Sequence, residues 1–164
     1  MKVSELMQGK ELIPSYEGVV TNDDFVLAIK TANEQATEKD YIVIQGGITS
    51  HAASINSETS ESQYIRTGKS TTRTDAQRQF SITGDRYCAD DAQEFLLSNK
   101  MKFATGKGAT VPYIYFNIFT GVGEKGTVTV DVTEDQGGEA GGNASFSINL
   151  MGTAKPVDYK YSQG

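Results

Sequence analysis

A glycine-rich segment offers the first pattern that could do chemistry. The segment GVGEKG at residues 121–126 matches the GxGxxG pattern of dinucleotide-binding sites. Such a site needs a helix to begin at the glycines, so that the helix N-terminus meets the pyrophosphate. The run TVTVDVT follows instead, and its β-branched residues predict a strand. We therefore expect a hairpin turn at residues 121–126, not a nucleotide site.

A second candidate is the tripeptide Gly68-Lys69-Ser70, which has the form of the end of a phosphate-binding P-loop. That pattern requires a glycine five residues before Gly68, where this chain has Gln63. The sequence predicts no strand before the tripeptide and no helix after it. We exclude a P-loop on these grounds.

Nucleophilic and metal chemistry is limited by the scarcity of two residue types. The chain has one histidine, His51, and one cysteine, Cys88. A Ser-His-Asp or Cys-His mechanism would have to use His51, which we interpret as an ordinary strand residue. We expect Cys88 to be a small buried residue. One cysteine forms no internal disulfide, and the two residues supply only two zinc ligands. The sequence predicts no enzyme, no metal and no cofactor.

A mild basic cluster, consisting of Arg66, Lys69, Arg73 and Arg78, lies in a polar stretch of the chain. Asp75 interrupts the cluster, and no aromatic residues alternate with the bases as they do in many nucleic-acid-binding segments. The cluster therefore favours contact with an acidic protein surface over nucleic-acid binding.

Composition sets the limits of the fold. The chain has 164 residues, a net charge of −6 and a pI of about 4.8. One domain is expected at this length, and a protein that grips DNA phosphates should be basic. We expect no signal peptide, because the first residues lack an apolar region, and no membrane helix, because no apolar stretch approaches about 20 residues. The 17 glycines and the hydrophobic fraction of 37% indicate a turn-rich β protein.

Hydrophobic alternation predicts most of the strands. Strong patterns cover residues 41–45, 80–87, 111–119, 127–133 and 144–150, and weaker ones cover 11–20 and 25–29. Both faces of 111–119 are apolar, so we expect both to be covered. Gly-rich turns separate the last three strands, which favours a meander. The predicted fold is an antiparallel β-sandwich or barrel flanked by one α-helix.

The one expected helix covers residues 90–98. Asp90 can accept a hydrogen bond as the N-cap, with Gln93 completing a capping box. Asp91 and Glu94 lie near the N-terminus, where the helix dipole favours negative charge. Helix capping explains this acidic cluster better than a metal site does. Ala92 and its neighbours form an apolar face that predicts packing on a sheet.

The predicted strands and helix divide the chain into three regions. We expect residues 1–40 to form an N-terminal arm, 41–156 a β-domain, and 157–164 a C-terminal tail. Residues 56–79 are rich in Ser and Thr and predict a long polar loop, which is usually functional in a compact domain. The N-terminal segment 1–40 and the loop 56–79 are too polar to fold alone, so we expect both to become ordered on assembly.

The outward positions of the last two strands are small and polar. They suit the wall of a water-filled channel, and as candidates for such a wall we name Thr127, Thr129, Asp131, Ser145, Ser147 and Asn149.

The order of these segments resembles that of the major tail tube proteins of long-tailed bacteriophages. The most similar pieces are FSITGDRY passing into DDAQEFLL, then VPYIYFNIFTGVGEKGTVTVDVT, and the closing NASFSINLMGTAKP. The resemblance covers roughly residues 41–156. It implies sixfold rings that stack into a hollow tube, through which DNA passes during ejection without specific binding.

The resemblance also implies partners and a location. These are further copies of the chain, together with tape measure, tail terminator and baseplate-type proteins, in a virion tail assembled in the host bacterial cytoplasm. In such proteins a long loop reaches a neighbouring subunit or ring. For that role we name Glu58, Glu61, Tyr64, Ile65, Arg66, Lys69 and Arg73.

Two alternatives stay open. One is a carbohydrate- or protein-binding adhesion module with a β-sandwich fold, although such modules usually present Trp or Tyr platforms and this chain has no Trp. The other is the tube of a phage-derived bacteriocin or secretion device.

Overall fold

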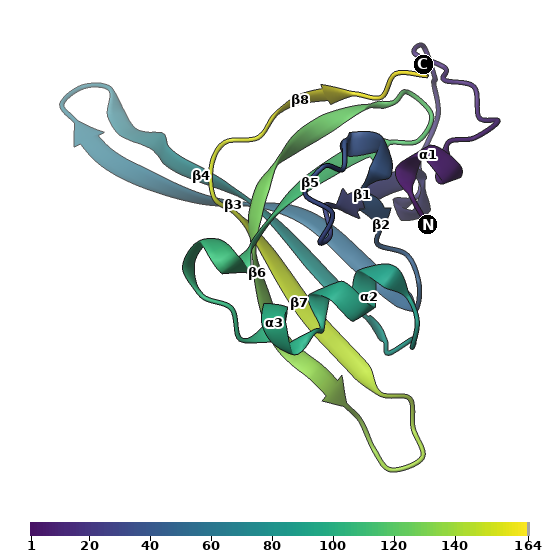
Figure 1. Ribbon diagram of the computed structural model, residues 1–164. Helices are drawn as coiled ribbons and strands as arrows, with labels where there is room; N and C mark the ends of the chain where they lie inside the picture. The colour runs from purple at the N-terminus through teal and green to yellow at the C-terminus, as the bar shows by residue number, and fades with distance from the viewer. Residues whose placement is uncertain (164) are drawn as a thin grey trace.

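One antiparallel sheet of eight strands dominates the computed structural model, which describes residues 1–163 (Figure 1). The strands are β1 (Phe25–Ile29), β2 (Ile42–Val43), β3 (Ile48–Tyr64), β4 (Gly68–Asp85), β5 (Thr110–Asn117), β6 (Val122–Gly137), β7 (Ser145–Gly152) and β8 (Val157–Lys160). The helices are short: α1 (Val3–Leu6), α2 (Asp91–Leu96), α3 (Asn99–Lys102), and the 3-10 turns η1 (Asn22–Asp24), η2 (Glu38–Asp40) and η3 (Gly106–Ala109). The mainly β, antiparallel class expected from the sequence is confirmed.

The strand order is β2-β1-β5-β6-β7-β4-β3, and β8 pairs with the start of β6. Strands β5, β6 and β7 are neighbours in chain order, which confirms the expected meander. The turn expected at residues 121–126 is misplaced by a few residues. The chain turns at 118–121, and Gly123 already pairs with Phe116 within the sheet. The β5 backbone passes so close to Gly123 that a side chain there would collide with it, so this strand position requires glycine.

The principal core lies on one face of the curled sheet. Alternate residues of β6 and β7 point into it, among them Val128, Phe146 and Ile148, which are at most 2% exposed. Leu27 of β1 and Leu96 of α2 pack against the same cluster. Strands β6 and β7 thus bury apolar residues on one face and leave polar residues on the other.

A second core covers the opposite face of β1 and β5. Ile114 and Phe116 are fully buried there, while Tyr113 points into the principal core. The expectation that β5 is covered on both faces is confirmed. The cover comes from Val3 of α1 and from Tyr161 near the C-terminus, whose ring stacks on Phe116.

The helix expected at residues 90–98 is present as α2 (Asp91–Leu96), and a second short helix, α3, follows it. The Asp90 side chain caps α2 by accepting the backbone N–H of Gln93 at 3.1 Å. The Gln93 amide does not complete a capping box. It is buried, donates to the carbonyls of Gly46 and Asp85, and accepts from the N–H of Tyr87. Gln93 thus ties the end of β4 to the start of α2.

The strand–helix junction differs from the expectation in another respect: Cys88 is exposed, not buried. It lies in the short link between β4 and α2, where Tyr87 is also 61% exposed. Ala92 and Leu96 of α2 fill the neighbouring part of the principal core, so Cys88 stays at the surface.

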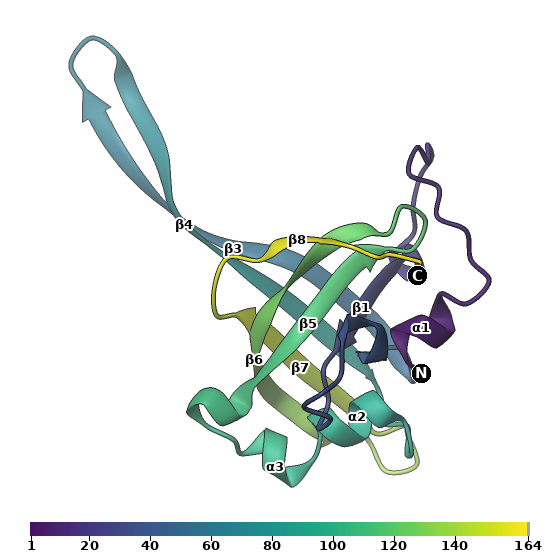
Figure 2. The ribbon, with the colours of Figure 1, turned by 45° about the horizontal axis from the view of Figure 1, so that its top comes forward.

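The expectation of an irregular loop at residues 56–79 is wrong. These residues extend β3 and β4 into a two-stranded hairpin that projects from the body (Figures 1 and 2). We call its free part, residues 56–77, the arm. Ser and Thr tolerate extended backbone, and sixteen residue pairs join β3 and β4 over their full length. The sequence lacked the large apolar residues that mark a half-buried strand, because no second layer covers the arm.

The two terminal regions also contribute to the body. Within residues 1–40, β1 lies between β2 and β5, and Val3 and Met7 are buried. Within residues 157–164, β8 pairs with β6. Whether residues 1–40 become ordered only on assembly stays a prediction, which hydrogen exchange on the monomer tests.

Two strand predictions in the first third of the chain need correction. Residues 11–20 form no strand, because Pro14 and a turn interrupt the extended backbone. The strong pattern at 41–45 corresponds only to the two-residue strand β2. The residues on either side of β2 pack into different cores, Tyr41 into the second core and Ile44 into the principal core.

Candidate functional site

The six channel-wall candidates lie on one face of the sheet. On β6 they are alternate residues, and Asp131 stands directly opposite Asn149 of β7. On β7 they alternate with the buried residues Phe146, Ile148 and Leu150. The structure therefore brings together Thr127, Thr129, Asp131, Ser145, Ser147 and Asn149.

Strands β4 and β3 extend this face. Asn149 is paired with Ser81, which donates a hydrogen bond to its side-chain oxygen at 3.1 Å, and Ser81 is paired with Ala52. The next row joins Ser147 to Thr83. We call the resulting surface of β6, β7, β4 and β3 the polar face.

Apart from Lys125, which lies two residues before Thr127 on the same side of β6 and pairs with Glu38 at 2.8 Å, the ionisable residues of the polar face are acidic. On the body they are Asp85, Asp131 and Glu134, and on the arm Glu58 and Asp75 stand directly opposite each other. The β3–β4, β4–β7 and β6–β7 pairs place no lysine or arginine on this face. Lys125 lies outside these pairs, where β6 pairs with β5 and β8. A surface of this kind repels phosphate and offers it no unpaired cation.

The polar face ends at two open strand edges. β3 is the last strand of the sheet, and its outer edge pairs with no other strand. The Asn22 amide caps one group there, the carbonyl of His51. β5 pairs with β6 only as far as Thr129, so the rest of β6 is paired on its β7 side alone. Open edges of this length are sites for pairing with another chain.

The strands of the arm carry Lys69 and Arg73, together with Glu61, on the face opposite Glu58 and Asp75. Lys69 is paired with Gln63, and Arg73 with Thr59, on the side that continues the inner face of the sheet. Lys69 also forms an ion pair with Glu61 at 2.8 Å. At the tip, Ile65 is 91% exposed and Arg66 has a φ of 72°. The structure thus distributes the seven arm candidates over two faces and a tip.

The base of the arm contains an ion pair that the sequence analysis did not assign. Arg78 and Glu124 form it, with side chains 16% and 23% exposed. The Arg78 guanidinium lies 5.0 Å from the ring centre of Phe80 and 5.4 Å from that of Tyr115. Arg78 is the last β4 residue before pairing with β7 begins. The signal in the sequence is weak, because the two partners are 46 positions apart.

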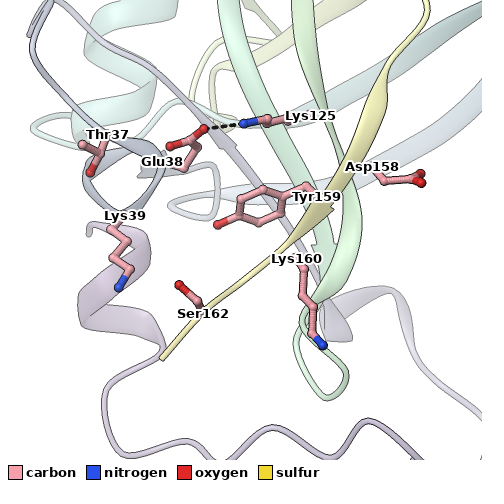
Figure 3. A pocket seen from close by; sticks show the side chains of 8 residues that line it. All are labelled: Thr37, Glu38, Lys39, Lys125, Asp158, Tyr159, Lys160 and Ser162. Carbon is pink, nitrogen blue, oxygen red and sulfur yellow. Dashed lines mark hydrogen bonds and ion pairs between the residues drawn. The ribbon is translucent and has the colours of Figure 1, made fainter. Parts of the chain in front are cut away.

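The pocket shown in Figure 3 is shallow, polar and of mixed charge. The Lys125 ammonium donates to the Glu38 carboxylate at 2.8 Å, and this bond lowers the pKa of Glu38. Burial raises the pKa of Tyr159 to about 12. No nucleophile lies next to a base in this pocket. The residues that line the pocket are Thr37, Glu38, Lys39, Lys125, Asp158, Tyr159, Lys160 and Ser162.

The structure does not arrange the remaining candidate residues as a catalytic, phosphate-binding or metal site. His51 lies within β3, and burial lowers its pKa. Gly68, Lys69 and Ser70 begin β4 at the hairpin turn. In the described part of the chain, no three His, Cys, Asp or Glu side chains gather as metal ligands. Over the same residues, no helix is long and apolar enough to cross a membrane.

Comparisons with known proteins give a fold. No family model and no curated protein matches the sequence. A chain from the tail of an empty gene transfer agent particle with C6 symmetry is similar in structure, with a TM-score of 0.59, 14% identity and coverage of 87% of this chain and 100% of that one.

Two further solved structures agree. One is a chain of the virion of a native gene transfer agent, with a TM-score of 0.57, 15% identity, and 85% and 98% of the two chains covered. The other is from the cap that terminates the tube of an anti-feeding prophage, with a TM-score of 0.52, 11% identity, and 94% and 98% covered. The chain therefore has the fold of phage-like tail-tube components.

Proposed function

We propose that this chain is a structural protein whose copies form rings that stack into a hollow tube, with the polar face lining the lumen. The observation that carries the proposal is the polar face itself. It spans four adjacent strands, its charges are acidic except for the Glu38-paired Lys125 at one end of β6, and it ends in two open edges. The fold shared with gene transfer agent tails supports the same role.

The open edges explain how a ring closes. Strands β6, β7, β4 and β3 alternate in direction, so β6 and β3 run antiparallel to each other. Rotation about an axis roughly along the strands preserves strand direction from one copy to the next. The free edge of β6 therefore meets β3 of its neighbour in antiparallel register. When the sheets of all copies join into one closed ring, both edges are paired and no strand edge is left for aggregation with other chains.

The charge of the polar face fits the passage of nucleic acid. DNA-binding proteins hold phosphates with lysine and arginine and release counterions in doing so. A lumen with Asp131 and Glu134 repels phosphate, and Lys125, the lysine on the same side of β6, is already paired with Glu38. A ring multiplies this repulsion by its number of copies. We propose that DNA slides through the tube without being retained.

A tube built of such rings would work together with other tail proteins. We propose that the tube forms part of a virion tail, assembled in the host bacterial cytoplasm with tape measure, tail terminator and baseplate-type proteins. The arm, with Glu58, Glu61, Tyr64 and Arg73 on its strands, supplies a contact to a neighbouring copy.

Negative-stain electron microscopy of the purified protein, fresh and after concentration, tests this function. We expect hollow tubes or rings. Persistent monomers at the highest concentration, together with binding in a glycan screen, would contradict the proposal and support an adhesion module.

A second candidate is the tube of a phage-derived bacteriocin or secretion device. The similarity to the tube-terminating cap of an anti-feeding prophage favours it. Sheath and baseplate genes beside this gene would support a contractile device. A long tape-measure gene without a sheath would support a flexible phage tail.

A further inference from the structure

The tip of the arm is apolar although the arm is otherwise polar. Ile65 is 91% exposed and Tyr64 is 57% exposed, at the turn of a hairpin that only its own two strands support. An isolated two-stranded ribbon is at best marginally stable in water. β4 continues for eleven residues, 68–78, without β7 beside it, a reach of about 35 Å. A projecting apolar tip on such a ribbon indicates a docking surface.

The charge of the tip identifies its partner as acidic. Residues 59–73 contain Arg66, Lys69 and Arg73 against Glu61, a net charge of +2. Since the whole chain carries −6, its other residues carry −8. The outer part of the arm, residues 59–73, is therefore basic, although Glu58 and Asp75 make the whole arm neutral. A second copy of this acidic chain offers the charge that complements the outer part.

The opposite end of β4 has the matching surface. Tyr87, two residues after β4 ends, is 61% exposed. Three acidic residues lie at this end of the body: Asp85 in β4, Asp91 at the start of α2, and Glu139 in the β6–β7 connection. That connection lies beside Asp85, because Asn143 donates to the Asp85 carboxylate at 3.2 Å. The base next to Tyr87, Arg86, is paired with Glu94 at 2.8 Å. We call this surface the acidic end.

The two surfaces lie at opposite ends of one strand. β4 has 18 residues, so about 60 Å separates the tip from the acidic end. Figure 2 shows the arm projecting from the body on the side away from α2 and the β6–β7 turn. One copy cannot join its own two surfaces. Two copies related by a shift along the strand direction can.

We propose that the tip of the arm docks on the acidic end of a second copy, with Tyr64 and Ile65 against Tyr87, and Arg66 near Asp91. The inference rests on the proposed tube, whose axis follows the strands. The contact joins two different surfaces, so it repeats without closing and gives the stack a single polarity. Screening by salt weakens it.

Cross-linking to the native cysteine tests the contact. Cys88 is exposed beside Tyr87, and Ile65→Cys places a second thiol at the exposed tip without touching the core. A short bismaleimide added to tubes of Ile65→Cys should give a ladder of trimers and longer products. Ile65→Cys combined with Cys88→Ser should give dimers at most, because only tip-to-tip linkage is left.

Val157→Cys is the matched control, since Val157 is 57% exposed but lies on β8, away from both surfaces. It should give no ladder. Tubes of Ile65→Cys that yield no more product than this control would overturn the docking contact while upholding the tube. A ladder from soluble oligomers that never form tubes would uphold the contact and contradict the tube. Neither tubes nor a ladder would overturn both.

A charge exchange provides an independent measurement. Arg66→Glu should slow tube elongation at least about tenfold at low salt, and Asp91→Lys should do the same. The double variant should recover most of the rate. Equal rates for all four proteins, or no recovery in the double variant, would contradict the contact.

Discussion

Arg78 and Glu124 form the charged contact that matters most for the stability of the arm's base. The pair joins β4 to β6 past the end of β7, and the guanidinium lies over the rings of Phe80 and Tyr115. A largely buried pair costs more to break than to replace, because a single substitution leaves one charge without its partner.

Arg78→Leu should therefore lower the free energy of unfolding by about 3 kcal/mol, and Glu124→Leu by a similar amount. The double variant should be at least as stable as either single variant. Urea denaturation of the four proteins measures the cycle. Additive losses in the double variant would show that the two side chains do not interact.

His51 gives the protein a pH dependence near neutrality. Burial lowers its pKa below the ordinary value of 6.5, although nearby Asp23 opposes the shift. The unfolded chain then binds more protons than the folded one just below pH 6.5. The contribution of neutral His51 is complete above that pH and decreases as the pH falls.

The urea midpoint should accordingly decrease between pH 7.5 and 5.5, and His51→Asn should reduce that dependence. The carboxyl groups whose pKa values are lowered by their lysine or arginine partners, such as Glu38 and Asp135, titrate at more acidic pH and leave this interval unaffected. An unchanged pH profile in His51→Asn would contradict the assignment.

At the scale of elements, the arm is separable from the body. Both cores consist of residues outside the arm. The sequence predicted strands wherever one face is buried, as in β6 and β7, since burial produces the alternation. The same rule failed for the arm, whose two faces are both exposed, and for β2, whose flanking residues turn into the cores.

Replacing residues 59–73 with Asn-Gly should keep the fold and abolish assembly. We expect the melting temperature to change by no more than about 3 °C, because no core contact is lost. Circular dichroism and electron microscopy measure the two effects. A fall of 10 °C or more, roughly 3 kcal/mol for a chain of this length, would show that the arm stabilises the body.

At the scale of the whole molecule, charges are distributed by face. The alternation of Thr, Ser and Asp in the last strands was enough to predict that six residues share a surface, and the register confirms it. The part of the same face on β3 and β4, and the acidic end, could not be predicted. They depend on which strands become neighbours, and that is decided by long-range packing.

The proposed acidic lumen predicts a specific gain of function. Asp131→Lys should make tubes retain DNA in a salt-dependent manner, because it adds one cation per copy to the lumen. Asp158→Lys makes the same charge change on β8, outside the polar face, and should leave DNA retention unchanged. Sedimentation of tubes with labelled DNA measures both. Equal retention by the two variants would contradict the lumen assignment.

The measurement that tests the central claim most directly is a cryo-EM reconstruction of the assembled tube. The account predicts that Asp131, Ser147 and Asn149 line the lumen, with β6 of each copy paired to β3 of the next. A reconstruction that places these three residues on the outer wall would contradict it.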